Sequence, residues 1–139
     1  YDIYPLQNSW PQAGAGVIGE LEVPETELEF LKRIKKTFEV GCLRHNKLLG
    51  REIQTVALCG GAGAFLMPPA HPHPGDVIIT GEIKYHDYFG HDTDILLAEI
   101  GHYESEQYTK EIFYTIIRDL FPHFEVQMTK VNTNPIKYM

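Results

Sequence analysis

The sequence predicts an α/β fold, in which a layered sheet, mixed or mostly parallel, is flanked by helices. Apolar, β-branched runs at residues 53–59, 76–82 and 94–100 have the length and composition of buried strands. Segments with helical periodicity lie at residues 24–38 and 104–120. Because strand and helix segments alternate along the chain, they are expected to form layers around one sheet.

The N-terminal region is predicted to hold a short strand, residues 2–6, followed by a connector. Residues 8–19 are rich in Gly, Pro, Asn and Gln, which favour turns over regular elements. This composition indicates the exit from a preceding domain.

The helix predicted next begins at Pro24 and carries acidic residues in its first turn and lysines in its last turns. Gly41 is a suitable residue to end it, and residues 42–44 are expected to add a short edge strand. The apolar residues that should face the sheet are Leu28, Phe30, Leu31, Ile34 and Phe38.

The strand at residues 53–59 runs into a glycine-rich turn, Gly60-Gly61-Ala62-Gly63. Two explanations stay open for these glycines: tight packing beside the strand, or a cradle for a phosphate group. The turn matches neither a complete dinucleotide fingerprint nor a P-loop. Residues 68–74 then contain four prolines, which exclude a helix interior, so a solvated loop carrying His71 and His73 is predicted there.

The composition is that of one folded, acidic domain. Of the 139 residues, 43% are hydrophobic and 12% aromatic, enough for a core. The net charge of −7 argues against a nucleic-acid surface, because phosphate binding depends on clustered Lys and Arg. No apolar run approaches the roughly 20 residues of a membrane span. The two cysteines, Cys42 and Cys59, form no disulfide or metal-binding pattern, so both are expected in the core of a cytoplasmic protein.

The junction between the third apolar run and the second helix holds the candidate site. The segment Ile100-Gly101-His102-Tyr103-Glu104-Ser105-Glu106 begins where the strand ends, and ligands of α/β sheets collect past the carboxyl ends of strands. His102 and Glu106 are four residues apart, one helical turn, so both side chains can reach a common point.

The helical pattern also predicts which acids face inward. An apolar stripe runs along the helix through Phe113, Ile116, Ile117 and Leu120. Glu106 falls in line with this stripe, whereas Glu104 and Glu111 are expected to face water. Two interpretations of Glu106 stay open: it meets a cation, a metal or several donors on the inward face, or it favours the helix dipole in a frayed first turn.

Polar side chains also gather at the end of the strand at residues 76–82, and they should lie beside His102 if the two strands are neighbours. They are Thr80, Glu82, Lys84, Tyr85, His86 and Asp87. Taken by itself, His86 is equally explained as a surface or capping histidine. After the second helix, residues 124–129 alternate and predict a final edge strand, and residues 132–135 predict a turn.

Six segments of the chain together resemble the C-terminal half of the Ngg-interacting factor three-like family, whose members are also known as GTP cyclohydrolase 1 type 2 homologues. The segments are residues 1–6, 16–21, 56–63, 80–87, 101–106 and 132–135. Their combination is specific, although no single segment is, and the similarity covers nearly the whole chain. The proline-rich loop at residues 68–74 departs from the smooth helix that the family has there.

The resemblance implies one lobe of a two-lobed α/β fold, with two divalent metal ions per full-length subunit, Zn, Mn or Fe, in the cleft between the lobes. His102 and Glu106 of the Gly-His-x-x-x-Glu motif would be metal ligands, and a missing N-terminal lobe of the same protein would supply the others. His86 and Glu82 would lie behind these ligands or face a substrate. Residues 1–12 would be the tail of an inserted domain or a linker, and residues 13–139 the C-terminal α/β lobe.

The resemblance also implies a homo-oligomer, a hexamer in the family, and two alternative functions. One is a metal-dependent hydrolase acting on a nucleotide or phosphoester, since a metal pair can activate water near neutral pH. The other is a non-catalytic metal-binding regulatory or protein-interaction module. Two protein ligands fall short of the three or four that hold a catalytic zinc ion, so the 139-residue chain alone is expected to be inactive and to bind metal weakly.

Overall fold

The structure is a computed structural model that describes residues 14–67 and 76–139. The strand predicted at residues 2–6 and the loop predicted at residues 68–74, with His71 and His73, lie outside these ranges. So does the first part of the predicted connector, residues 8–13.

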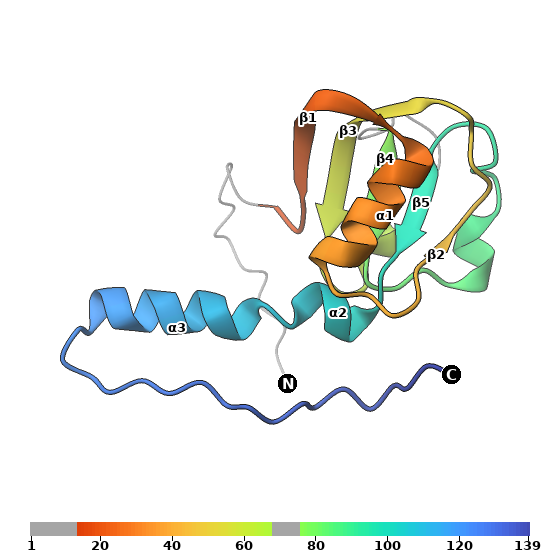
Figure 1. The fold of residues 1–139 in the computed structure, drawn as a ribbon. Helices are drawn as coiled ribbons and strands as arrows, with labels where there is room; N and C mark the ends of the chain where they lie inside the picture. The colour runs from red at the N-terminus through yellow and green to blue at the C-terminus, as the bar shows by residue number, and fades with distance from the viewer. Residues whose placement is uncertain (1–13, 68–75) are drawn as a thin grey trace, which may run out of the picture.

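The described residues form a mixed five-stranded sheet in the order β1-β3-β4-β5-β2 (Figure 1). The strands are β1 (Val17–Thr26), β2 (Arg44–His45), β3 (Glu52–Cys59), β4 (Val77–Thr80) and β5 (Leu96–Glu99). The three central strands are parallel, and both edge strands run antiparallel to their neighbours. The predicted α/β class and the mixed, layered sheet are confirmed.

Helix α1 (Glu27–Thr37) covers one face of this sheet (Figure 1). It begins at Glu27 and not at Pro24, because the Thr26 hydroxyl caps it by accepting a hydrogen bond from the Glu29 N–H at 3.4 Å. Phe30, Leu31 and Ile34 are buried, as predicted, but Leu28 is 52% exposed and faces away from the sheet.

The central strand β4 separates two hydrophobic clusters, since alternate side chains of a strand point to opposite faces. Val77 and Ile79 pack in the cluster that contains α1, and Ile78 packs in the other cluster with Leu97. Short 3-10 helices, η1 (Gly63–Leu66) and η2 (Tyr85–Tyr88), follow β3 and β4. All four residues of β4 are buried, so the strand holds the segment that follows it in a fixed position.

Strand β1 corrects the sequence prediction, which assigned residues 8–19 to a connector. From Val17 the chain pairs with β3, beginning opposite Leu58. Leu21 and Val23 alternate with acidic residues, which is the period of a half-exposed strand. The nearby glycines and prolines concealed this signal, because they are typical of turns.

The helix predicted at residues 104–120 is two helices, α2 (His102–Glu106) and α3 (Thr109–Leu120). α3 points away from the sheet, and the rest of the chain returns alongside it without forming a strand (Figure 1). The strand predicted at residues 124–129 is therefore wrong. The apolar stripe of α3 finds no cover within the described residues: Phe113 is 59%, Ile116 46% and Leu120 67% exposed.

The break between α2 and α3 also reverses the prediction for the acids. Because the two helices are not continuous, the inward face of α3 does not extend to α2. Glu104 is buried at 7% exposure, whereas the side chain of Glu106 is 53% exposed. Of the cysteines, Cys59 is buried as expected, but Cys42 is exposed. Among the described helices, none has the length and apolar character needed to cross a membrane.

Candidate functional site

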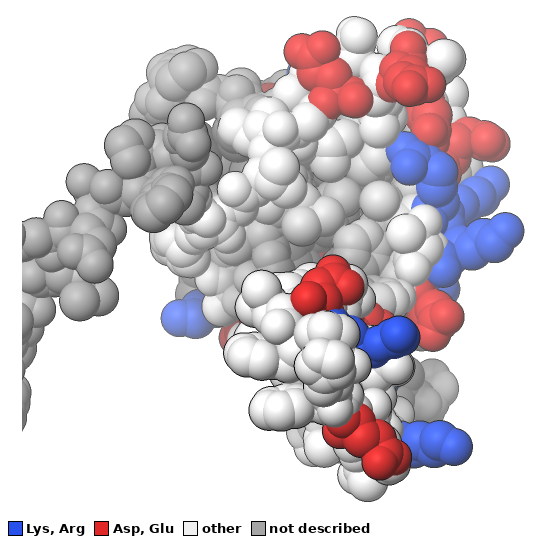
Figure 2. All heavy atoms as spheres, turned by 90° about the vertical axis from the view of Figure 1, so that its left-hand side faces the viewer, with Lys and Arg blue, Asp and Glu red and all other residues white. Residues whose placement is uncertain are grey.

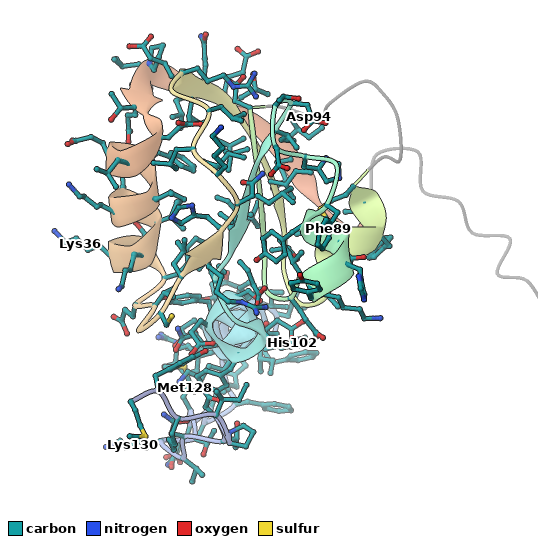
Figure 3. All side chains as sticks on the ribbon, turned by 90° about the vertical axis from the view of Figure 1, so that its right-hand side faces the viewer. Lys36, Phe89, Asp94, His102, Met128 and Lys130 are labelled. Carbon is teal, nitrogen blue, oxygen red and sulfur yellow. The ribbon has the colours of Figure 1, made fainter. Side chains whose placement is uncertain are left out.

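The carboxyl ends of three adjacent parallel strands bring distant parts of the chain together. β3 leads into Gly61, β4 leads into Glu82, and β5 leads into His102 at the start of α2. Figure 3 shows His102 just beyond the ends of the strands. The expectation that the strand before Glu82 and the strand before His102 are neighbours is confirmed, since β4 and β5 pair in parallel with Thr80 opposite Glu99.

His102 lies between two carboxylates. Its Nε2 atom is 3.5 Å from Glu106 Oε2, and its Nδ1 atom is 3.4 Å from Glu82 Oε2. These distances are longer than those of strong charge-assisted hydrogen bonds. The side chains of His102, Glu82 and Glu106 are 50%, 52% and 53% exposed, so the group is open to solvent.

A glycine lies directly against this group. Gly61 has a φ angle of +65°, which glycine adopts without strain. A Cβ atom at Gly61 would lie 2.5 Å from Glu106 Oε1 and 3.5 Å from His102 Nε2. Any side chain at residue 61 would therefore fill the space that the two functional groups share.

Two hydroxyl groups hold the Gly61 turn in place. The fully buried Thr80 hydroxyl donates to the Gly61 carbonyl at 2.9 Å and accepts from the Gly63 N–H at 2.8 Å. On the other side, the Ser105 hydroxyl accepts from the Gly61 N–H at 2.9 Å and donates to the His102 carbonyl at 2.8 Å. The turn after β3 is thereby connected both to β4 and to α2.

Tight packing explains the neighbouring glycines. A Cβ atom at Gly63 would lie 2.6 Å from the Cys59 Cβ atom, and one at Gly81 would lie 2.5 Å from the Ser105 hydroxyl. Of the two explanations that the sequence left open, close approach of the backbone is the one this geometry supports.

The structure brings together three of the four predicted site residues. His86 lies on η2, where its ring contacts Tyr85 and Phe89 at centroid distances of 5.3 and 6.2 Å. Among the described contacts, none joins His86 to His102, Glu82 or Glu106, so its assignment near a substrate stays a prediction.

A cavity of about 550 Å³ opens beside His102 and Glu106. Lys110 of α3 contributes to its wall, and Thr133 and Asn134 of the returning C-terminal segment line the opposite side. This volume is within the range of small-molecule sites. A second cavity, of about 260 Å³, lies along β1 and β3, and its apolar lining contains no His, Asp or Glu.

Sequence reasoning found the charged groups and missed the groups that hold them. Gly61 drew attention as part of a glycine-rich turn, but its contact with Glu106 depends on which strands are neighbours. Thr80 is one of the polar side chains expected beside His102, and Ser105 lies in the segment around His102. Their hydrogen bonds to the Gly61 turn were not predicted, because a single hydroxyl residue carries no signal of its own.

Known proteins resemble this chain in sequence and in fold, and the similarity covers the residues of the candidate site. The curated relatives include a protein named "GTP cyclohydrolase 1 type 2 homolog" from Halalkalibacterium halodurans, 34% identical over 145 aligned residues that cover 100% of this chain and 38% of the relative. Another with the same name, from Streptococcus pneumoniae, is 30% identical and covers 96% of this chain and 53% of the relative. The chain thus spans between about one third and one half of these relatives.

Solved structures share the fold. The crystal structure of a Bacillus cereus protein related to NIF3 superposes with a TM-score of 0.74 at 24% identity, covering 99% of this chain and 39% of that one. A Staphylococcus aureus protein gives a TM-score of 0.70 at 24% identity, covering 89% of this chain and 42% of that one.

The family profile described as Duf34/NIF3 (NGG1p interacting factor 3) matches residues 2–135. This match includes the three strand ends that surround His102 and extends through the C-terminal segment beside the cavity. The chain belongs to the Duf34/NIF3 family.

Proposed function

We propose that this chain is the C-terminal lobe of a protein that binds two metal ions, and that His102 and Glu106 are ligands of one or both ions. The observation that carries the proposal is the separation of 3.5 Å between His102 Nε2 and Glu106 Oε2. Two ligand atoms that are each about 2.1 Å from a tetrahedral zinc ion lie about 3.4 Å apart. A divalent cation therefore fits between these atoms with little movement.

The surroundings of His102 fit the same role. A histidine ligand usually donates its second ring N–H to a carboxylate or carbonyl, which fixes the ring and its tautomer. Glu82 is placed to accept such a hydrogen bond from Nδ1, and this leaves the lone pair of Nε2 directed toward Glu106. Gly61 keeps the space between the two ligand atoms free of a side chain.

The donor set is incomplete within the described residues, where no group of three or more His, Cys, Asp or Glu side chains can hold a metal ion. Glu82 does not make the third donor, because it lies on the opposite ring nitrogen from Glu106. We infer that the remaining ligands come from an N-terminal lobe, since the relatives are roughly two to three times as long as this chain.

We propose further that the full-length protein is a metal-dependent hydrolase of a nucleotide or phosphoester. A bound divalent ion would supply Lewis-acid polarisation of a substrate oxygen. The cavity beside His102 would hold the substrate, with the Lys110 ammonium in its wall near anionic groups. The name GTP cyclohydrolase 1 type 2 homolog, carried by relatives about 30% identical, supports a nucleotide as the substrate class.

The test uses the full-length protein, with zinc affinity measured by chelator competition and hydrolysis measured on a panel of nucleotides and phosphoesters. His102→Ala is expected to weaken zinc binding by at least about 100-fold, because it removes one of only three or four ligands, and to abolish turnover. His91→Ala is the matched control, because His91 pairs with Asp94 at 3.3 Å in the loop before β5. Equal zinc affinity in His102→Ala and the wild type would refute the metal assignment.

The alternative function is a non-catalytic metal-binding module for regulation or protein interaction. The family description, NGG1p interacting factor 3, favours it because it refers to an interaction. Zinc binding that depends on His102, without hydrolysis of any substrate in the panel, would support this alternative over the hydrolase.

The proposed N-terminal lobe also accounts for the exposed helix α3. Figure 2 views the molecule from the side on which α3 projects, and uncharged side chains make up most of its surface there, with a few acidic and basic groups between them. Phe113, Ile116 and Leu120 form an apolar stripe on this helix. We propose that the N-terminal lobe or a further subunit of a homo-oligomer, a hexamer as the family resemblance implies, covers this stripe.

A further inference from the structure

An ion pair holds the backbone of Ile83, the residue that follows Glu82 in the candidate site. Arg44 of β2 contacts the carboxylate of Glu99 at the end of β5. The Glu99 side chain is only 13% exposed, and a carboxylate removed from water to this extent requires hydrogen-bond partners. Besides Arg44, Glu99 Oε2 accepts a hydrogen bond from the Tyr88 hydroxyl at 3.1 Å.

The same pair engages both backbone groups of Ile83. Arg44 Nη2 donates to the Ile83 carbonyl at 3.1 Å, and the Ile83 N–H donates to Glu99 Oε2 at 3.3 Å. The Ile83 side chain is 1% exposed and packs in the cluster with Ile78 and Leu97. The backbone at residue 83 is therefore fixed by its side chain and by both of its polar groups.

Glu82 immediately precedes this fixed residue. The Glu82 side chain is 52% exposed, and its Oε2 atom lies 3.4 Å from Nδ1 of His102. An exposed side chain of this length has many rotamers, so the direction in which its backbone presents it determines how often it meets His102. We propose that Arg44 and Glu99 are positioning residues that present Glu82 to His102, an inference that for its effect on metal affinity rests on the proposed function.

Glu99 affects the pKa of both side chains that contact its carboxylate. Burial raises the pKa of the Tyr88 phenol well above its usual value, and the neighbouring Glu99 carboxylate raises it further. The hydrogen bond to Glu99 raises the pKa of the Arg44 guanidinium, against the opposing effect of burial. Tyr88 consequently remains a hydrogen-bond donor to Glu99 throughout the neutral range.

The Arg44–Glu99 pair could instead stabilise the fold without any effect on the site. The two roles differ in one measurable respect. If the Arg44–Glu99 pair acts through Glu82, removing the pair does not lower zinc affinity any further in a protein whose residue 82 can no longer hold His102. A purely stabilising pair affects the protein to the same extent whether Glu82 is intact or not.

The experiment measures zinc affinity of the full-length protein by chelator competition for wild type, Arg44→Met, Glu82→Gln and the double variant. We expect Arg44→Met and Glu82→Gln each to weaken zinc binding by about 10-fold, the lower end for residues that orient a metal ligand. The double variant is expected to lie within about 2-fold of Glu82→Gln alone, as required for residues that act through one another.

Arg33→Met is the matched control. Like Arg44, Arg33 pairs with a carboxylate, that of Glu25, at 2.9 Å. Its guanidinium lies 5.2 Å from the centroid of the Phe30 ring, as that of Arg44 lies 6.0 Å from the centroid of the Tyr88 ring. Arg33 belongs to α1, which is none of the elements that lead into the site, so the loss of the Arg33 side chain should leave zinc affinity unchanged. Zinc affinity of Arg44→Met within about 2-fold of wild type, or a double variant whose loss is the product of the two single losses, would overturn the inference.

A second measurement needs no metal. In the metal-free protein, the ¹⁵N signals of the His102 ring are expected to shift in Arg44→Met, in Glu99→Gln and in Glu82→Gln, but not in Arg33→Met. If the wild type binds no zinc, the proposed function fails, and these signals alone decide the inference. Unchanged His102 signals in both Arg44→Met and Glu99→Gln would then refute the positioning role.

Discussion

Gly61 is the residue of the candidate site at which substitution is most restricted. Gly61 combines a positive φ angle with direct contact to the Glu106 carboxylate, where an added Cβ atom would lie 2.5 Å from Oε1. The backbone conformation alone disfavours other residues. The contact adds a second restriction, which concerns the site and not the fold.

Gly50 allows these two restrictions to be measured separately. It also has a positive φ angle, +76°, but an added Cβ atom would meet nothing within 4 Å. We predict that Gly61→Ala and Gly50→Ala each lower the free energy of unfolding by about 1 kcal/mol, but that only Gly61→Ala displaces Glu106 and weakens zinc binding by about 10-fold or more. Denaturant unfolding and chelator competition on both variants provide the measurement, and equal zinc affinities would contradict this account of Gly61.

The proximity of His102 and Glu106 could be predicted from the sequence because their spacing is local. His102 and Glu106 are one helical turn apart, and α2 indeed brings them to 3.5 Å. Thr80 and Ser105 could not be predicted, because their hydrogen bonds to Gly61 span 19 and 44 residues of sequence. Such contacts depend on strand order, which no local pattern contains.

At the level of elements, the break between α2 and α3 decides which acid is buried. Glu104 lies in the interior side of α2, where its Oε1 atom accepts a hydrogen bond from Asn134 Nδ2 at 3.2 Å. Burial raises the pKa of the nearby Tyr138 phenol, and the Glu104 charge contributes to this shift. α2 is therefore the element to which the C-terminal segment is attached.

The attachment can be tested by Glu104→Ala. Loss of the carboxylate removes the acceptor of the hydrogen bond that Asn134 Nδ2 donates, so we predict a decrease of about 1–2 kcal/mol in the free energy of unfolding. Hydrogen exchange at the Asn134 and Ile136 amides, which donate to nearby Asn side chains, should become about 10-fold faster. Glu111→Ala serves as the control, because Glu111 is exposed and lies 3.9 Å from Lys110. Similar exchange in both variants would show that Glu104 does not hold the segment.

For the molecule as a whole, helix α3 raises the question of what stabilises it. Its 12 residues include no buried one, and isolated helices of this length are marginal in water. Helix α1 has 11 residues, and it buries Phe30, Leu31 and Ile34 against the sheet. The two helices are thus similar in length and opposite in environment.

We predict that α3 is stable only in the longer protein. In the isolated 139-residue chain, the amides of α3 should exchange with solvent at nearly unprotected rates, whereas in the full-length protein they should be protected by at least about 100-fold. The amides of α1 are the internal control and should be protected in both. Strong protection of α3 in the isolated chain would contradict the proposal that another lobe or subunit covers its apolar stripe.

The same difference explains which parts of the fold the sequence could predict. The parallel strands β3, β4 and β5 and the helix α1 bury their apolar residues against one another, so their periodicity reports their real environment. Residues 109–139 have few such contacts within the described chain. The apolar stripe of α3 predicts a buried face, but Phe113, Ile116 and Leu120 are exposed in the structure, so this prediction is wrong for the described residues.

The convergence of the ends of β3, β4 and β5 has a consequence for how the chain folds. Neighbouring strands are about 4.8 Å apart, so Gly61 and His102, which follow β3 and β5, can meet across β4 only when all three are aligned. A slip of β4 by one residue would turn Thr80 to the opposite face and break its two hydrogen bonds to the Gly61 turn. If the proposed zinc site forms at these strand ends, a zinc-dependent signal during refolding would report the correct register of the central strands, and it should emerge in the last kinetic phase and not in any earlier collapse.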